Sequence, residues 1–482
     1  MVRFLCIVSL VLCLALHPCR ARSIAGAAPC WEELAAYSVA PSDSRWANVS
    51  RINNPAFNGN SSSSQPAFVV LPSSDAQVQR ALACAVRRQL RVAVKAGGHS
   101  FAGYSTVSAP GFVINLQLMK QVSWDNDTVV NVQAGATWAD VYSAFKARGG
   151  LWVVTGGLCP SVGVAGFTQG GGVGPSARQF GLAADNLIAA TVVLANASRI
   201  VHADAYTNAD LHWALRGGGG GNWGIVTSLT FQVFRGPPLY TFGHFCMNAT
   251  RDAAAAFLHL VSSNNAYAPR DINIDITYDS DAICLWVVYQ GPQIHLADLL
   301  APLLHAPTSP PLVSSLVQEF NCFHELIEFY ALQKGYQQYD SQPYTLKNCL
   351  VNSTGLSLLP SVLPLKNVPD NCGISLIHFG GRVGDHDASF TVFPWRDSQY
   401  MLYASCGWTD SESENEAKAW LADFFAEEGD LCHGAYVNFI DASLSNWAEQ
   451  YYGPNLERLQ KVKAKWNPSG SSPMRFPQEI RA

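Results

Sequence analysis

The sequence predicts an α+β protein of two large domains. Of its 482 residues, 48% are hydrophobic and 14% are charged, a composition typical of a globular protein with an extensive core. Up to residue 235, short apolar runs that favour strands alternate with segments of helical periodicity. Gly236-Pro237-Pro238 then punctuates the chain, and the segments beyond it indicate a mostly antiparallel sheet backed by helices. We therefore place a domain boundary at these three residues.

Periodicity and turn residues predict the individual elements. In the first domain, strands are expected over 68–71, 91–95, 112–116, 128–132, 187–194, 199–202 and 225–234, and helices over 31–37, 75–89, 137–148 and 209–215. In the second, strands are expected over 241–247, 272–278, 282–289 and 373–380, and helices near 252–263 and 410–428. The chain ends in a helix with an apolar stripe at Leu456, Leu459, Val462 and Trp466, so its lysines are expected on a solvated face.

Two glycine-rich stretches, 91–104 and 149–186, are the features around which the first domain is organised. Apolar residues such as Trp152 and Val164 are interleaved with the glycines, which is not the composition of a flexible linker. Backbone without Cβ atoms can press its N–H groups against a large flat or phosphorylated ligand. His99 and Cys159 each follow a pair of glycines. We infer that the two loops enclose one cofactor.

Other signatures of a functional site fit less well. Gly172-Val173-Gly174-Pro175-Ser176-Ala177 matches a dinucleotide fingerprint, but Pro175 and Gly181 leave no room for the long helix that must follow. Residues 98–102, GHSFA, resemble the nucleophile elbow of a serine hydrolase, which stays open as an alternative although Ala102 replaces the final glycine. His324-Glu325 lacks the second histidine of a zinc helix, so no metal site is expected.

The N-terminus indicates secretion. Residues 1–21 contain Arg3 and the apolar run FLCIVSLVLCLAL, which is too short to span a bilayer and is typical of a cleaved signal peptide. No later segment approaches the length of a membrane-spanning helix, and the net charge of −5 does not favour nucleic acid as a partner. Six glycosylation sequences agree with an extracellular protein: Asn48, Asn60, Asn126, Asn196, Asn248 and Asn352.

Cysteine arithmetic leaves at least one thiol unpaired. Of the 13 cysteines, three lie in the predicted signal peptide. If Cys159 is reserved for other chemistry, nine remain, and an odd number cannot all pair in an oxidising compartment.

Four ordered motifs resemble one protein family. AGGHSFAGYS resembles the histidine loop of the berberine-bridge-enzyme-like FAD-linked oxidases, and GLCPSVGVAGFTQGGGVGPSARQFGLAADNL resembles their cysteine loop. LRGGGGGNWGIVTSLTF resembles a third FAD segment, and YYGPNLERLQKVKAKWNP a C-terminal signature. The resemblance implies a PCMH-type flavoprotein of the vanillyl-alcohol-oxidase fold. Its FAD domain of two α/β subdomains would span 30–236, its substrate domain 237–439, and a C-terminal segment, 440–482, would return to the FAD domain.

The same resemblance assigns the site. His99 would bond the flavin 8α-methyl group and Cys159 the flavin C6 position, giving a bicovalent FAD, while Val162 would control the approach of oxygen. Tyr436 of the triplet Tyr436-Val437-Asn438 would be the catalytic base. The remaining cofactor contacts would be Gly97, Gly98, Ser100, Gly103, Gly156, Gly157, Gly163, Gly166, Gly174, Gly224, Ile225 and Val226.

The resemblance also implies a disulfide between Cys30 and Cys84 and an oxidase reaction. We expect a secreted monomer that oxidises an alcohol or sugar hemiacetal and reduces oxygen to hydrogen peroxide. Trp395-Arg396 departs from the family's His-Arg pair, and no carboxylate just upstream offers a glutamate base. An oxidase of aromatic or secondary-metabolite alcohols, and a flavin-binding protein without turnover, remain as alternatives.

Overall fold

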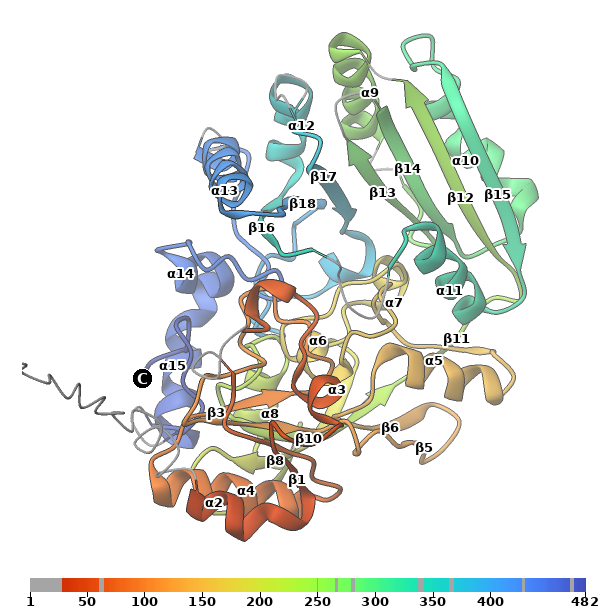
Figure 1. Ribbon diagram of the computed structural model, residues 1–482. Helices are drawn as coiled ribbons and strands as arrows, with labels where there is room; N and C mark the ends of the chain where they lie inside the picture. The colour runs from red at the N-terminus through yellow and green to blue at the C-terminus, as the bar shows by residue number, and fades with distance from the viewer. Residues whose placement is uncertain are drawn as a thin grey trace, which may run out of the picture.

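The computed structural model contains three main sheets in its described residues, two in the lower half of the view and one in the upper half (Figure 1). The predicted signal peptide over 1–21 and Asn60 lie outside the described residues. The structure describes residues 28–59, 65–248, 250–264, 268–278, 282–336, 342–363, 368–426, 430–468 and 472–482.

The first sheet has the order β1 (Ser38–Val39), β2 (Val69–Val70), β4 (Phe112–Asn115), β3 (Val92–Lys95), with β4 parallel to both β2 and β3. Helix α4 (Asp75–Arg88) begins where the Ser74 side chain accepts a hydrogen bond from the Gln77 N–H, as expected for an N-cap serine. Its buried face packs on α2 (Ala28–Leu34), and a disulfide between Cys30 and Cys84 joins the two helices. The expected pairing of these cysteines is confirmed.

The second sheet is antiparallel, with the order β5 (Val122–Trp124), β6 (Val129–Gln133), β10 (Gly224–Gln232), β8 (Leu187–Leu194), β9 (Ile200–Asp204). The strand expected over 225–234 ends at Gln232, and its last part forms β11 (Phe234–Arg235), which pairs with β7 (Trp152–Val153). Between β6 and β10 the chain also forms α5 (Trp138–Ala147), α6 (Val164–Gln169), α7 (Ala177–Phe180) and α8 (Ala209–Leu215), whereas α3 (Trp46–Ser50) packs on β2 of the first sheet.

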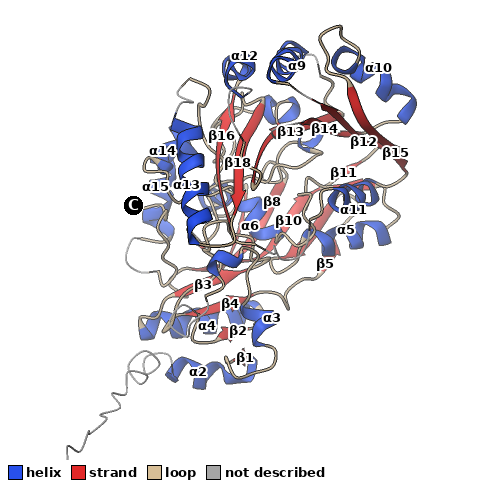
Figure 2. Cartoon of the chain, turned by 45° about the horizontal axis from the view of Figure 1, so that its top comes forward, coloured by secondary structure: helices blue, strands red, loops and turns tan. Residues whose placement is uncertain are grey.

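The third sheet has seven antiparallel strands. Its order is β15 (Leu312–Phe320), β12 (Tyr240–Asn248), β14 (Ala282–Tyr289), β13 (Ile272–Tyr278), β17 (Cys372–His378), β18 (Tyr400–Gly407), β16 (Tyr344–Val351). Helices cover its outer face (Figure 2), and they are α9 (Arg251–Asn264), α10 (Gln293–Leu304), α12 (Ser353–Val362) and α13 (Ser411–Ala426). This confirms the predicted antiparallel sheet backed by helices, although the pattern did not predict β15, β16 or β18.

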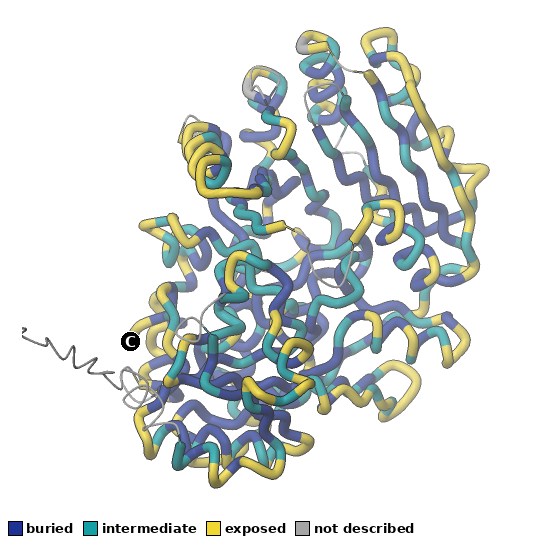
Figure 3. The backbone as a smooth tube through the Cα atoms, viewed as in Figure 1, coloured by how far each residue is buried: buried dark blue, intermediate teal, exposed yellow. Residues whose placement is uncertain are grey.

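The opposite face of this sheet turns toward the first two sheets. Helix α11 (Phe323–Gln333) lies between them, and its buried side chains belong to the same hydrophobic core as those of the lower sheets. Figure 3 shows most strands as buried and the outward turns of the covering helices as exposed. Three further disulfides, Cys246–Cys284, Cys349–Cys432 and Cys372–Cys406, lie in or beside the seven-stranded sheet. Cys322 is buried and forms no disulfide. It is the unpaired thiol expected from the nine cysteines that remain when Cys159 is set aside.

The C-terminal segment contains α14 (Trp447–Tyr452) and α15 (Leu456–Trp466). The prediction of solvated lysines holds for Lys461 but is wrong for Lys463, whose side chain is fully buried and forms an ion pair with Glu479 at 2.7 Å. Periodicity within one helix cannot reveal that the following tail folds back over it. No helix in the described part of the chain is long and apolar enough to cross a membrane.

Candidate active site

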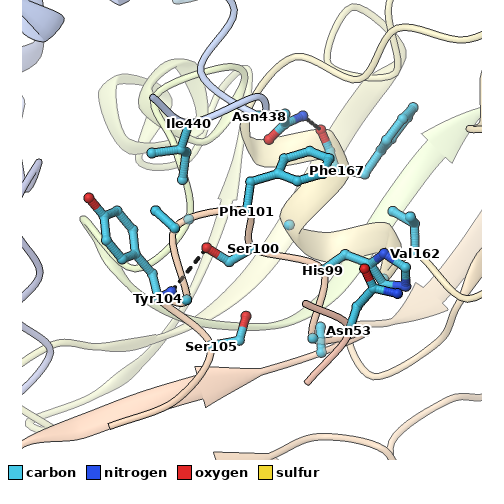
Figure 4. Close-up of a pocket in the computed structure, with 18 of the residues that line it drawn as sticks. Asn53, His99, Ser100, Phe101, Tyr104, Ser105, Val162, Phe167, Asn438 and Ile440 are labelled. Carbon is cyan, nitrogen blue, oxygen red and sulfur yellow. Dashed lines mark hydrogen bonds between the residues drawn. The ribbon is translucent and has the colours of Figure 1, made fainter. Parts of the chain in front are cut away.

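A cavity of about 940 Å³ lies between the glycine-rich loops and the seven-stranded sheet (Figure 4). Its volume is at the upper end of the range for small-molecule and cofactor sites. Every residue that the sequence assigned to the site lines this cavity except Gly156, which packs behind it against the ring of Trp138 and the hydroxyl of Tyr142. The fold thus brings together residues that are spread from Gly97 to Tyr436.

The two glycine-rich loops meet backbone to backbone. A Cβ atom at Gly97 would stand 2.2 Å from the Gly163 nitrogen, and one at Gly163 would stand 2.3 Å from the Gly97 nitrogen, so neither position admits a side chain. At Gly174 a Cβ atom would stand 1.9 Å from the carbonyl oxygen of Gly156. Gly166 differs, because a Cβ atom there would meet nothing within 4 Å and would project into open space. This glycine surface fits a large flat cofactor.

His99 and Cys159 approach each other across the contact between the loops. The Oγ atom of Ser161 lies 2.8 Å from Nε2 of His99 and 3.4 Å from Sγ of Cys159. Burial, together with the nearby ammonium of Lys95, lowers the pKa of His99 to about 4. The imidazole is therefore neutral at physiological pH. The sequence analysis did not identify Ser161, although its place two residues after Cys159 was a signal.

The hydroxyl of Tyr436 is buried among hydrogen-bond donors. Its Oη accepts hydrogen bonds from the N–H groups of Gly172 at 2.8 Å and Val173 at 3.1 Å, and from Nδ2 of Asn438 at 2.9 Å. Nδ2 also donates to the carbonyl of Phe167 at 2.7 Å, which sets the orientation of the Asn438 amide because a carbonyl only accepts. Burial raises the pKa of Tyr436 above its usual 10, while these three hydrogen bonds act in the opposite direction.

Asn348 on β16 holds the segment that carries Tyr436. Its Oδ1 accepts a hydrogen bond from the Tyr436 N–H at 2.8 Å, and its Nδ2 donates to the carbonyl of Phe439 at 2.7 Å. The neighbouring Cys349 is bonded to Cys432, just before this segment. No sequence pattern linked residues this far apart, so Asn348 was missed.

The cavity extends to the inner face of the seven-stranded sheet, where Asp275 of β13 contributes a buried carboxylate. The carboxylate accepts hydrogen bonds from the His378 N–H at 2.9 Å, from Nδ2 of Asn273 at 3.0 Å and from the Tyr330 hydroxyl at 3.3 Å. Burial raises the pKa of Asp275. An acidic residue inside the predicted strand 272–278 was the signal for this group, and the sequence analysis did not use it.

Polar and apolar side chains share this end of the cavity. The polar ones, besides Asp275 and Asn273, are Tyr336, Tyr344, Tyr403 and Ser405, and the apolar ones are Phe101, Leu346, Ile377, Met401 and Phe439. Neither Trp395 nor Arg396 takes part. Arg396 forms a buried ion pair with Asp185 at 2.8 Å, and Nε1 of Trp395 donates to the Gln450 carbonyl at 2.9 Å.

The serine hydrolase alternative is wrong. A nucleophile elbow requires a helix immediately after the serine, and the described residues after Ser100 form turns instead. Oγ of Ser100 accepts a hydrogen bond from the Tyr104 N–H at 3.0 Å, whereas His99 contacts Ser161. His324 is buried, and its Nε2 lies 2.9 Å from the Trp152 carbonyl oxygen. This contact and the rings of Tyr142 and Phe145 give His324 a structural role in the core.

The glycine-lined cavity, the facing loops of His99 and Cys159 and the seven-stranded antiparallel sheet are those of a flavoprotein of the PCMH type. A family model described as "FAD binding domain" matches residues 66–203, and one described as "Berberine and berberine like" matches residues 435–471. The chain belongs to the berberine-bridge-enzyme-like family of FAD-linked oxidases, and FAD is its cofactor.

Similar proteins act on different substrates. Reticuline oxidase from Eschscholzia californica is 28% identical over 460 residues, covering 87% of this chain and 84% of that protein. Glucooligosaccharide oxidase from Sarocladium strictum is 28% identical over 430 residues, covering 84% of this chain and 85% of that protein.

Solved structures of the family superpose over nearly the whole chain. Physcomitrella patens BBE-like 1 matches with a TM-score of 0.82 at 25% identity, covering 94% of this chain and 98% of that one. A chitooligosaccharide oxidase matches with a TM-score of 0.82 at 23% identity, covering 95% of this chain and 99% of that one. The second likeness bears on the fold alone.

Proposed function

We propose that this protein is a secreted oxidase that converts an alcohol or a sugar hemiacetal to the carbonyl product, a lactone in the case of a sugar, and reduces oxygen to hydrogen peroxide. The observation that carries the proposal is the buried phenol of Tyr436, which lines the cavity and receives three hydrogen bonds at Oη. Such a group can take a hydroxyl proton because the donors stabilise the negative charge left on its oxygen.

The chain's own residues orient the substrate and move the proton. FAD, when bound, supplies the two-electron chemistry by accepting a hydride and returning the electrons to oxygen. Tyr436 takes the hydroxyl proton at Oη, and Asn438 and the N–H groups of Gly172 and Val173 hold that oxygen in place. Asp275 accepts hydrogen bonds from substrate hydroxyl groups at the sheet end of the cavity. The side chains that enclose this end exclude water.

Carbohydrate is the proposed substrate class. Carboxylate, amide and phenol groups at the sheet end can hydrogen-bond several hydroxyls, and the aromatic rings of Phe101 and Phe439 offer faces for a sugar ring. One relative is named as a glucooligosaccharide oxidase, which supports this choice. The second candidate is an aromatic or secondary-metabolite alcohol, favoured by the apolar surface of Leu346, Ile377 and Met401.

The test is oxygen consumption and peroxide release with the purified holoenzyme and two panels of compounds, reducing mono- and oligosaccharides in one and aromatic alcohols in the other. The proposal expects turnover with at least one sugar and formation of the lactone. Turnover confined to the aromatic panel would transfer the assignment to the second candidate. Flavin that is neither reduced nor turned over by either panel would favour a binding protein.

We also propose that FAD is attached at both His99 and Cys159, which face each other across Ser161. After denaturation of the wild-type protein, the flavin should stay with the polypeptide. The double variant His99→Ala/Cys159→Ala should release all of it, whereas each single variant should retain a linked fraction. Complete release from His99→Ala alone would show that Cys159 is not a link.

Oxygen is the proposed electron acceptor, and Val162 the residue that controls its approach. Val162 lines the cavity between Cys159 and Gly163, so its side chain stands where the two glycine loops meet. Reduced enzyme should reoxidise much faster in air-saturated buffer than under nitrogen, and Val162→Leu should slow this step more than flavin reduction. Equal reoxidation rates in air and nitrogen would refute an oxidase.

The remaining proposals concern organisation and location. Residues 30–236 would bind FAD, 237–439 would bind substrate, and 440–482 would return to the FAD domain. Four disulfides support a secreted protein, because such bonds persist in oxidising compartments. Recovery of glycosylated protein lacking residues 1–21 from the medium of a eukaryotic host would support secretion, and retention inside the cell would count against it.

A further inference from the structure

Ser161 stands between the two residues that are proposed to carry the flavin. Its Oγ contacts Nε2 of His99 at 2.8 Å and Sγ of Cys159 at 3.4 Å. The turn that contains Ser161 is closed by its backbone, since the Val162 N–H donates to the Cys159 carbonyl at 3.2 Å. The hydroxyl is therefore not needed to form the turn. Both of its contacts are with the side chains of His99 and Cys159, one on each of the two glycine-rich loops.

A serine hydroxyl has one hydrogen and two lone pairs, so it can accept one hydrogen bond and donate another. In the arrangement that makes both neighbours nucleophilic, Nε2–H of His99 donates to Oγ, and Oγ–H donates to Sγ of Cys159. The other nitrogen of the imidazole then keeps its lone pair, and the sulfur is stabilised as a thiolate, which is its reactive form. Burial and Lys95 keep His99 neutral and so maintain the lone pair.

We propose that Ser161 is the positioning residue for attachment of FAD, holding the imidazole of His99 and the sulfur of Cys159 in their reactive forms through its single hydroxyl. This inference rests on the proposed attachment at both residues. Each link breaks one N–H or S–H bond of the protein and one C–H bond of the flavin, and forms one C–N or C–S bond. Counted from the neutral imidazole and the thiol, whose proton leaves when the thiolate forms, each link releases two electrons and two protons, which pass to oxygen and give hydrogen peroxide.

The test compares Ser161→Thr with Ser161→Val, two side chains of nearly equal volume that differ by the hydroxyl. Labelled riboflavin is pulsed into cells that express the protein, and each link is followed by mass spectrometry of the flavin peptides. Ser161→Val should form both links about tenfold more slowly than Ser161→Thr, the factor expected for the loss of one hydrogen bond to a reacting group. Flavin absorbance before denaturation should be the same in both.

Ser143→Ala is the control, because Ser143 is an exposed serine of α5 that does not line the cavity. It should form both links at the wild-type rate. If Ser161→Val does not accumulate as folded holoprotein, Ser161→Ala replaces it in the comparison with Ser161→Thr.

The outcomes separate this inference from the one on which it rests. Wild-type protein that releases all its flavin would refute attachment and the role of Ser161 together. Wild-type protein with both links, and a Ser161→Val protein that forms them as fast as Ser161→Thr, would overturn the role of Ser161 alone. Slow linking in Ser161→Val with normal linking in Ser161→Thr and Ser143→Ala would support it.

Discussion

At the scale of single residues, the hydroxyl of Tyr436 is in an unusual environment. A neutral phenol oxygen accepts at most two hydrogen bonds and donates one, yet three donors surround Oη. This arrangement favours the phenolate, whereas burial opposes it and leaves the pKa of Tyr436 above 10. Burial therefore keeps the resting phenol neutral, while the three donors stabilise the phenolate, which is the form that can take a proton.

Replacing Tyr436 with phenylalanine keeps the ring and removes the oxygen. We expect Tyr436→Phe to retain FAD and to slow anaerobic flavin reduction by roughly 10²–10⁴, the usual contribution of a positioned base. Tyr451→Phe is the control, because the Tyr451 hydroxyl is buried outside the cavity and accepts a hydrogen bond from the Asp441 N–H. A rate for Tyr436→Phe within a few-fold of wild type, measured by stopped flow, would remove Tyr436 from the mechanism.

The raised pKa of Tyr436 also predicts how the rate depends on pH. Below that pKa the phenolate is a minor form, and its fraction grows as pH rises. Flavin reduction should therefore accelerate by roughly tenfold per pH unit in the neutral to mildly alkaline range, if the phenolate is the form that takes the proton. The Tyr436→Phe enzyme should lose this slope. A wild-type rate that is independent of pH would contradict the prediction.

At the scale of the elements, β16 contributes to the site by presenting Asn348. Its amide accepts a hydrogen bond from the Tyr436 N–H and donates one to the Phe439 carbonyl, which fastens both ends of the segment that carries the proposed base. Because the amide reaches no substrate directly, its effect should be on the position of Tyr436.

We expect Asn348→Ala to lower kcat by roughly tenfold to a hundredfold, the effect of losing about 1–3 kcal/mol of hydrogen bonding, with little change in KM. Asn348→Asp keeps the acceptor for the Tyr436 N–H and should recover part of the loss. Steady-state kinetics with an active substrate measures both. An equal fall in stability without a change in kcat would show that Asn348 serves the fold alone.

Helix α11 connects the seven-stranded sheet to the core below it through His324. Burial lowers the pKa of this imidazole to about 4, against about 6.5 in an unfolded chain. Between these values the unfolded chain binds a proton that the folded protein does not bind, so the free energy of unfolding decreases as pH falls from 6.5 toward 4.

The predicted contribution of His324 is roughly 3 kcal/mol over this interval. His324→Gln cannot titrate, so its unfolding free energy should decrease less steeply with acid than that of the wild type. Thermal or denaturant unfolding between pH 7 and about 4 tests this. Parallel curves for the two proteins would show that the imidazole titrates normally.

At the scale of the whole molecule, the end of the chain is fastened to the third glycine-rich segment. Nζ of Lys463 and Nδ2 of Asn467 donate to the Asn222 carbonyl at 2.8 and 2.7 Å, and the Ile480 N–H donates to Oδ1 of Asn222 at 3.0 Å. Asn222 follows five consecutive glycines that reach the cavity at Gly220 and Gly221. The C-terminal tail thereby supports one wall of the cofactor site.

Two lysines of α15 form ion pairs that allow a matched test of this contact, Lys463 with Glu479 of the tail and Lys461 with Glu457 of the same helix. Glu479→Gln removes the partner of the buried Lys463 and should lower the free energy of unfolding by about 1–3 kcal/mol. Glu457→Gln removes the partner of the exposed Lys461 and should cost less than about 1 kcal/mol. Melting temperatures of the two variants give the comparison. Equal effects would show that the tail does not bury the Lys463 pair in solution.

The sequence alone predicted the glycine loops and the α+β fold class, and the resemblance of its motifs to one family predicted FAD as the cofactor. Those features are local, because a run of glycines or a strand pattern reports its own conformation through sterics and burial. The tertiary structure alone decided that Lys463 is buried, that Asn348 holds Tyr436, and that Asp275 reaches the cavity. Each depends on segments distant in the chain, whose approach is set by the packing of whole sheets. Ser161 lies between these cases, since it is near Cys159 in sequence but meets His99 only when the two loops fold together.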